Sequence, residues 1–174
     1  MRTRLLPHFM KVKPLRAKIL VLSDLASRGE REDRSGPAVC EVLEANGWTV
    51  LATDILPDDI AMIYARLEAW AEAGDCDGIF TSGGTGAGPR DVTPEATRAV
   101  IEKELPGFAE RIRSKGAEKT PLAALTRGVV GFRHGVLIVN LPGSPRGARE
   151  SLETVIGILP HAIDIIQGRT GHPE

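Results

Sequence analysis

The chain has few cysteines, no surplus of charge of either sign and no long apolar run. Among its 174 residues, 22 basic side chains nearly balance 23 acidic ones, for a formal net charge of −1. A nucleic-acid-binding surface needs a basic excess to displace counterions, so this balance argues against a nucleic-acid partner. No apolar stretch approaches membrane-spanning length, and Leu5-Leu6 is too short for a signal-peptide core, so we expect no membrane association.

The two cysteines are too far apart in the sequence to form a CxxC pair. Cys40 and Cys76 each lie in or beside an apolar helical pattern, which predicts buried, reduced thiols and a cytoplasmic location. The four histidines lack metal-binding spacings such as HxxxH, so we expect no zinc site.

With 42% hydrophobic and 26% charged residues, the chain can bury the core of one compact domain. Its basic residues are concentrated at the start, because six precede the first acid, Asp24: Arg2, Arg4, Lys11, Lys13, Arg16 and Lys18. We predict a flexible basic arm over residues 1–16 and a single domain over 17–170. An arm that contacts a membrane, an acidic partner or RNA is the alternative.

Apolar runs typical of buried strands alternate with helical patterns. The strand-like runs are 18–24, 48–56 and 78–82, and the helical patterns begin near residues 35, 60, 94, 106 and 145. Short links between them predict a three-layer α/β/α domain with a mostly parallel sheet. Segments 129–132 and 136–139 predict a small hairpin, although 135–140 equally suits a buried parallel strand. Pro160 should kink the last helix.

The most informative segment is the glycine-rich stretch 81–95, which connects a strand to a helix. Its glycines leave backbone N–H groups free to face an anion, which predicts a phosphate site. Thr93-Pro94-Glu95 has the signature of a helix start, with the threonine oxygen as a cap. Pro89-Arg90 stand where a Walker A loop has Lys and Ser/Thr, and Pro89 replaces the third glycine of a dinucleotide fingerprint. An ordinary crossover loop without a ligand is the alternative.

Two aspartates predict a metal beside this phosphate site. Asp91 ends the glycine-rich segment, where a carboxylate would repel phosphate unless a cation came between them, and Asp58 follows the second strand. Mg²⁺ is usually held by one or two carboxylates together with substrate phosphates. The alternatives are an N-cap role for Asp58, and for Asp91 a pairing with Arg90 or a cap of the following helix.

Two further polar segments follow predicted strands. Ser144-Pro145 opens a helix whose positive end is expected to face the same crevice, although Ser144 is equally suited to be a plain N-cap. After the first strand come Ser23, Asp24 and Ser27. They predict either a polar edge that contacts a ligand or a solvated loop. No nucleophile has a recognisable neighbouring base, so the residues favour phosphoryl or nucleotidyl transfer over covalent catalysis.

Several ordered motifs resemble the molybdopterin-binding MogA/MoaB family of molybdenum cofactor biosynthesis. The resemblance covers residues 18–167 and is carried by Ser23-Asp24, Ala26-Ser27-Arg28-Gly29, Asp33-Arg34-Ser35-Gly36-Pro37, Pro57-Asp58, Thr81-Ser82-Gly83-Gly84-Thr85-Gly86, Arg90-Asp91-Val92-Thr93-Pro94-Glu95-Ala96-Thr97, Pro106-Gly107-Phe108 and Asn140-Leu141-Pro142-Gly143-Ser144-Pro145. It implies the three-layer fold, a trimer or a dimer of trimers, and an activity that joins AMP from Mg-ATP to molybdopterin. Other proteins of molybdenum cofactor biosynthesis are expected as partners.

The resemblance also implies residue roles. Asp58 and Asp91 take the catalytic and Mg²⁺-binding positions, and the substrate-binding positions are Ser23, Asp24, Ser27, Ser82, Gly83, Gly84, Thr85, Gly86, Asn140, Pro142, Gly143 and Ser144. Leu25 departs from the pattern, because the family commonly has arginine there. A non-catalytic molybdopterin carrier of the MoaB kind is the main alternative, and a phosphate-ester or nucleotide hydrolase is a weaker one.

Overall fold

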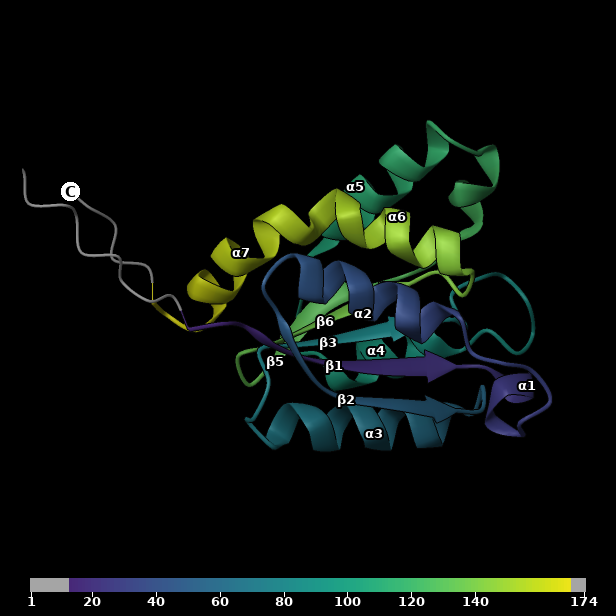
Figure 1. The fold of residues 1–174 in the computed structure, drawn as a ribbon, viewed down its shortest axis with the longest axis horizontal. Coiled ribbons are helices and arrows are strands. Elements are labelled where there is room, and N and C mark those ends of the chain that lie inside the picture. The colour runs from purple at the N-terminus through teal and green to yellow at the C-terminus, as the bar shows by residue number, and fades with distance from the viewer. Residues whose placement is uncertain (1–12, 170–174) are drawn as a thin grey trace, which may run out of the picture.

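A six-stranded sheet forms the middle of the protein (Figure 1). The computed structural model describes residues 13–169. In spatial order the strands are β2 (Thr49–Leu56), β1 (Arg16–Leu22), β3 (Gly78–Ser82), β6 (Val136–Leu141), β5 (Val130–Arg133) and β4 (Lys103–Glu104). The pairs from β2 to β6 are parallel, whereas β5 and β4 are antiparallel to their neighbours. The predicted mostly parallel sheet is therefore confirmed.

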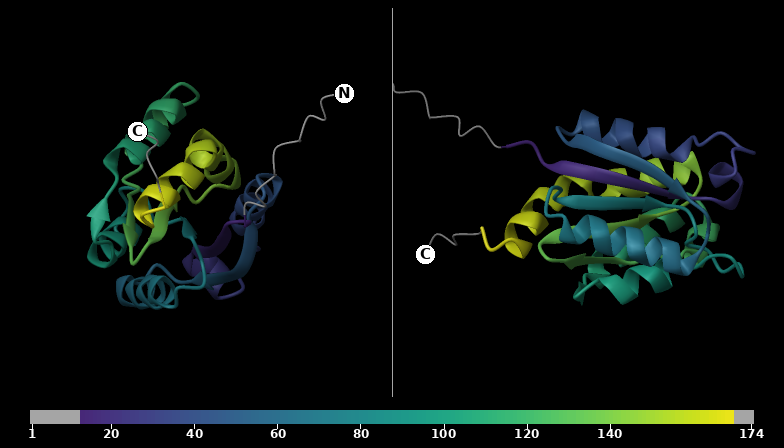
Figure 2. Two further views of the ribbon diagram at one scale, coloured as in Figure 1. Left: turned by 90° about the vertical axis from the view of Figure 1, so that its left-hand side faces the viewer. Right: turned by 90° about the horizontal axis from the view of Figure 1, so that it is seen from below.

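Helices cover both faces of this sheet, as the side views show (Figure 2). One layer holds α2 (Ser35–Ala45), α5 (Pro106–Ala117), α6 (Pro145–Val155) and α7 (Leu159–Ile166), and the other holds α3 (Ile60–Glu72) and α4 (Thr93–Val100). Alternate residues of a strand serve opposite layers: Ile19 belongs to the first core and Leu20 to the second. The three-layer prediction holds, and it leaves the strand ends open for a site.

The hairpin and the parallel strand predicted as alternatives are both present. β5 and β6 form an antiparallel hairpin that turns at His134 and Gly135, both with positive φ, and β6 also pairs in parallel with β3. The helix predicted to begin near residue 94 is α4, which ends at Val100, because Ile101 is extended and Lys103–Glu104 pairs with β5 as an edge strand. Pro160 was predicted to kink the last helix, and a 3₁₀ turn, η2 (Ile156–Ile158), lies just before it between α6 and α7.

Both cysteines are free, but they differ in burial. Cys76 is buried, and this burial raises the pKa of its thiol to about 11. Cys40 is only half-buried, so the predicted burial holds for Cys76 alone. None of the helices in residues 13–169 is long and apolar enough to cross a membrane. Residues 1–12 of the predicted basic arm lie outside the described residues.

Candidate active site at the carboxyl ends of the strands

A cavity of about 830 Å³ lies where the parallel strands end. Side chains and backbone from the loops after β1, β2, β3 and β6 line it, as expected for a ligand crevice in an open α/β sheet. The predicted site residues that the cavity brings together are Ser23, Asp24, Asp58, Gly83, Gly84, Asp91, Gly143 and Ser144. Four separate loops therefore meet at one place, which the sequence alone could only suggest.

Asp58 has an unsatisfied carboxylate oxygen in this cavity. Its Oδ2 accepts a hydrogen bond from the Asp24 backbone N at 3.2 Å, and its own backbone N donates to Asp24 Oδ1 at 3.0 Å. The other oxygen, Oδ1, is buried without a hydrogen-bond partner, and burial raises the pKa of the carboxyl above its ordinary value. The N-cap of α3 is Asp59, which accepts from Met62 N at 2.9 Å, so the capping alternative for Asp58 is wrong.

Asp91 closes the glycine-rich loop on itself. Its Oδ2 accepts from Gly88 N at 2.8 Å, and its backbone N donates to Gly88 O at 3.0 Å. Arg90 instead pairs with Asp24, and α4 has no side-chain cap, so neither alternative predicted for Asp91 holds. A Cβ at Gly86 would lie 2.8 Å from Asp91 Oδ2, which explains a glycine at that position.

Two glycines of the glycine-rich loop line the cavity, and both have backbone conformations that favour glycine. Gly83 and Gly84 have φ of +109° and +63°, and a Cβ at Gly83 would lie 2.2 Å from Leu22 O. Thr93 was expected to cap α4, but its hydroxyl donates to Gly83 O at 3.0 Å and is buried. The loop is therefore fixed against β1 and α4 with no space for a larger residue.

The carboxylates of the cavity have the donor chemistry of a magnesium site. An unpartnered, buried oxygen of Asp58 shares the cavity with Asp91, and hard cations such as Mg²⁺ prefer carboxylate oxygen ligands. Within residues 13–169, no group of three or more His, Cys, Asp or Glu side chains is placed to hold a metal. The described side chains alone therefore do not complete the coordination of a metal ion, which leaves positions for phosphate oxygens.

The start of α6 forms the cavity wall next to this loop. Ser144 Oγ accepts from Gly147 N at 3.0 Å, so Ser144 is the predicted N-cap of α6. It also lines the cavity, as predicted for a helix start that faces the crevice. A Cβ at Gly143 would lie 3.2 Å from Gly83 Cα, so the two loops meet backbone to backbone. This close approach leaves the positive end of α6 beside the glycine-rich loop.

The remaining predicted residues do not line the cavity. Ser82, Thr85 and Asn140 are buried behind it. Asn140 donates to Thr81 Oγ1 at 3.0 Å and Thr97 Oγ1 at 2.9 Å and accepts from Val129 N, so its amide supports the wall from within. Direct ligand contacts by these three residues and by Ser27, Gly86 and Pro142 stay predictions.

Sequence reasoning missed several residues of the site. Arg31 and Arg34 line the cavity, and Arg31 donates to Ser23 Oγ at 3.2 Å. They lie in the charged stretch after Ser27, where the number of arginines was the available signal. The helix α1 (Asp24–Ser27), capped by Ser23, was also missed because a single turn has no apolar periodicity.

The ion pair of Asp24 and Arg90 predicts a specific pH dependence of stability. The hydrogen bonds from Arg90 hold the pKa of Asp24 below its ordinary 3.8. This stabilisation is therefore fully present above pH 3.8 and is lost as the pH falls through the lower pKa of the folded state. Urea unfolding in metal-free buffer should show wild type more stable than Arg90→Gln at neutral pH, with the gap closing below about pH 4. A constant gap down to about pH 2 would contradict the pair.

Comparison with known proteins identifies the family of this chain. A family model described as "Probable molybdopterin binding domain" (MoCF_biosynth) matches residues 18–161. The chain belongs to this molybdopterin-binding family. It is 41% identical over 152 residues to the molybdopterin adenylyltransferase of Helicobacter pylori, covering 86% of each chain. It is 38% identical over 168 residues to that of Escherichia coli, covering 88% of this chain and 86% of the relative.

Solved structures in the same family have the same fold. The molybdopterin biosynthesis enzyme MoaB of Thermus thermophilus superposes with a TM-score of 0.84 at 51% identity, covering 88% of this chain and 97% of that one. The family resemblance and the fold predicted from the motifs are therefore confirmed.

Proposed function

We propose that this protein is a molybdopterin adenylyltransferase. It transfers AMP from ATP to the terminal phosphate of molybdopterin and releases pyrophosphate. The observation that carries the proposal is the buried, unpartnered Oδ1 of Asp58, in the same cavity as Asp91 and the glycine-rich loop. Relatives named molybdopterin adenylyltransferase, with about 40% identity over most of the chain, support the same reaction.

In the proposed reaction, a phosphate oxygen of molybdopterin attacks the α-phosphorus of ATP in line. The bond from that phosphorus to the oxygen bridging to the β-phosphate breaks, and the electron pair leaves with pyrophosphate. Because this chemistry needs mainly orientation and charge stabilisation, no protein nucleophile takes part. The start of α6 and Arg31 supply the positive potential that the phosphates require.

Asp58 and Asp91 would hold Mg²⁺ between the cavity wall and the phosphates. The ion would supply charge neutralisation on the pyrophosphate as it leaves. The backbone N–H of Gly84 would face the phosphates, since no Cβ separates it from a ligand, whereas the Gly83 N–H donates to Leu141 O and holds the loop on β6. Leu25, 39% exposed, lines the cavity where the family commonly has arginine, and we assign the compensating charge to Arg31.

Further parts of the proposal concern the cell and the assembly. From the family resemblance we infer a homo-oligomer, either a trimer or a hexamer. We also infer that it works in the cytoplasm with other proteins of molybdenum cofactor biosynthesis. Light scattering on the purified protein distinguishes trimer from hexamer.

The test of the proposed function is incubation of the purified protein with molybdopterin and Mg-ATP. Adenylylated molybdopterin and an equal amount of pyrophosphate are the expected products. Molybdopterin binding without turnover would instead assign a carrier, and ATP hydrolysis without molybdopterin would assign a hydrolase. Either result would overturn the proposal.

Asp91→Asn should keep the fold and molybdopterin binding and lose most of the transfer. Asparagine retains an oxygen that can accept from Gly88 N, so the loop keeps its closing bond, but the negative charge is gone. A loss of about 100- to 1000-fold in kcat is expected, the range for removal of one strong electrostatic group. Circular dichroism and molybdopterin titration check the fold and binding. Full pyrophosphate release by this variant would defeat the assignment.

A further inference from the structure

We propose that Arg127 is a positioning residue that holds the glycine-rich loop, and with it Asp91, in place for the transfer reaction. It lies between η1 (Pro121–Leu125) and β5, far from the loop in sequence, and it was not among the residues predicted for the site. This inference rests on the contacts of Arg127, on the exposure of the loop and on the ion pair that anchors the guanidinium. Its kinetic part rests on the proposed function.

Arg127 binds the loop at three backbone carbonyls. Its Nε donates to Gly86 O at 2.7 Å and its Nη2 donates to Asp91 O at 2.8 Å. Its backbone N donates to Thr85 O at 2.8 Å. One residue therefore holds both ends of the segment 86–91, the part of the loop that carries the proposed metal-binding carboxylate.

The segment between these two ends needs such an anchor. Residues 87–90 are exposed, and the mutual bonds of Gly88 and Asp91 close only a small turn. These bonds fix the shape of the turn but not its position relative to Asp58. On that side the turn is held by the ion pair of Arg90 with Asp24, whose exposed position makes it a weak restraint. The bonds from Arg127 to the carbonyls on either side fix that position, and an error of about 1 Å at a reacting group can cost roughly 100-fold in rate.

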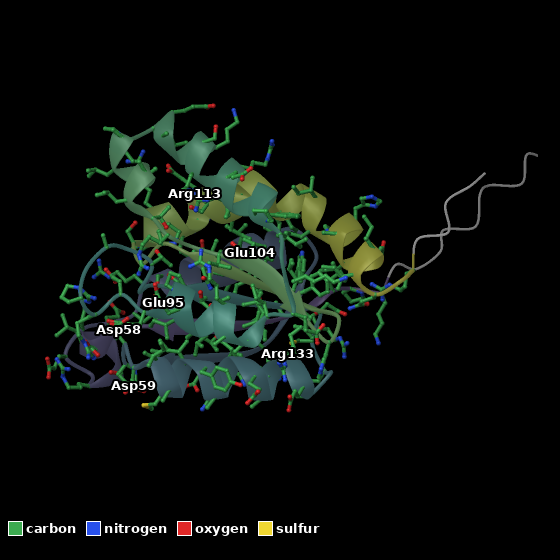
Figure 3. All side chains as sticks on the ribbon, turned by 180° about the vertical axis from the view of Figure 1, so that it is seen from behind. Asp58, Asp59, Glu95, Glu104, Arg113 and Arg133 are labelled. Atoms are coloured by element: carbon green, nitrogen blue, oxygen red, sulfur yellow. The ribbon has the colours of Figure 1, made fainter. Side chains whose placement is uncertain are left out.

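Arg127 is itself fixed by Glu95 on α4. Its Nη1 pairs with Glu95 Oε1, and its Nη2 lies 3.4 Å from Glu95 Oε2. Glu95 stands in the first turn of α4, where a negative charge is favourable. Figure 3 shows Glu95 on the same side of the molecule as Asp58. The loop is thus connected through Arg127 to a helix packed on the sheet.

Lysine cannot replace these contacts, which makes Arg127→Lys a sharp test. A guanidinium presents five donors in a planar fork, whereas an ammonium on a flexible stem cannot reach two carbonyls and a carboxylate in the same geometry. The charge is kept, so a change in rate reports geometry and not electrostatic potential. We expect kcat to fall about 10- to 100-fold, with the KM for molybdopterin nearly unchanged.

Arg133→Lys is the matched control. Arg133 also donates to one backbone carbonyl, Val100 O at 3.2 Å, and pairs with two carboxylates, Glu68 and Glu72. It lies on the side of the molecule opposite Asp58 (Figure 3). This variant should lose a comparable amount of stability and keep kcat within about twofold of wild type. Equal losses of kcat in both variants would overturn the proposal.

A second measurement does not depend on activity. Amide hydrogen exchange in the free protein should become faster at residues 86–91 in Arg127→Lys, with β3 and α4 unchanged, because the loop loses the anchor that the guanidinium provides. Unchanged exchange at 86–91 would overturn the proposal. If wild type shows no transfer, the proposed function fails, and the exchange result still decides the role of Arg127.

Glu95→Gln covers the case in which Arg127→Lys does not fold. It removes the charge that anchors the guanidinium and leaves both carbonyl bonds possible. We expect a smaller fall in kcat and faster exchange over the same residues. Wild-type exchange and kcat in Glu95→Gln would count against the connection from α4 through Arg127 to the loop.

Discussion

Asp58→Asn is expected to abolish most adenylyl transfer and at the same time to raise the melting temperature. The unpartnered Oδ1 loses its charge, so the proposed metal-binding position is lost and kcat should fall about 100- to 1000-fold. The pKa of Asp58 is raised in the folded protein by burial, so the ionised carboxylate costs stability at neutral pH. Asparagine keeps an acceptor for Asp24 N and removes that cost.

The gain in stability is modest but has a clear sign. A raised pKa means that stability is lost as the pH rises through the pKa of the folded state, so the variant should exceed wild type most above that point. We expect up to about 1 kcal/mol, reduced by solvent because the carboxyl is only half-buried. Differential scanning calorimetry of both proteins in metal-free buffer, at a series of pH values from about 4 upward, measures it.

The neighbouring aspartate provides the control. Asp59 caps α3, and asparagine is about as good a cap as aspartate, so Asp59→Asn should change neither transfer nor stability appreciably. Loss of transfer in Asp58→Asn together with a lower melting temperature would indicate a structural role for Asp58. Retained transfer would remove it from the site altogether.

Gly83→Ala should be the most destabilising single change in the loop. Its φ of +109° is strained for any residue with a Cβ, and the added atom would lie 2.2 Å from the Leu22 carbonyl oxygen of β1. The loop is held because Gly83 N donates to Leu141 O and its carbonyl accepts from Thr93, and β1 is held because it pairs with both β2 and β3. A loss of about 3 to 5 kcal/mol is expected, enough to prevent accumulation of a marginally stable protein.

Gly29→Ala separates backbone strain from the steric clash. Gly29 also has a positive φ, +72°, but a Cβ there meets nothing within 4 Å. This variant should lose only about 1 kcal/mol, the cost of the backbone conformation. Urea unfolding of both variants gives the comparison. A similar loss in the two would mean that the contact with Leu22 is not what requires glycine at position 83.

Much of the fold could be predicted from local patterns. The buried run at β1 and the helical spacing in α3 identified their elements, since each depends on burial of its own side chains. The glycine-rich loop and Asp58 were identified because strand ends in a parallel sheet meet at one edge. The strand β4 could not be found in this way, because it exists only through its pairing with β5.

The residues that support the site could not be predicted from the sequence for a similar reason. Arg127 contacts Gly86 across 41 residues of sequence, and no local period or motif marks it. Asn140 was predicted as a ligand residue from its motif, yet its side-chain amide donates hydrogen bonds to Thr81 and Thr97 within the core. The contacts that fix a loop are made by the finished fold, so they become visible only in three dimensions.

The most direct test follows a label on the α-phosphorus of ATP in a single turnover. Wild type, Asp58→Asn and Asp59→Asn are each saturated with molybdopterin and given labelled Mg-ATP. If Asp58 acts with the glycine-rich loop on both substrates in one cavity, the label passes to molybdopterin in wild type and Asp59→Asn but not in Asp58→Asn. Equal labelling of molybdopterin by all three proteins, or label found only in free AMP, would contradict it.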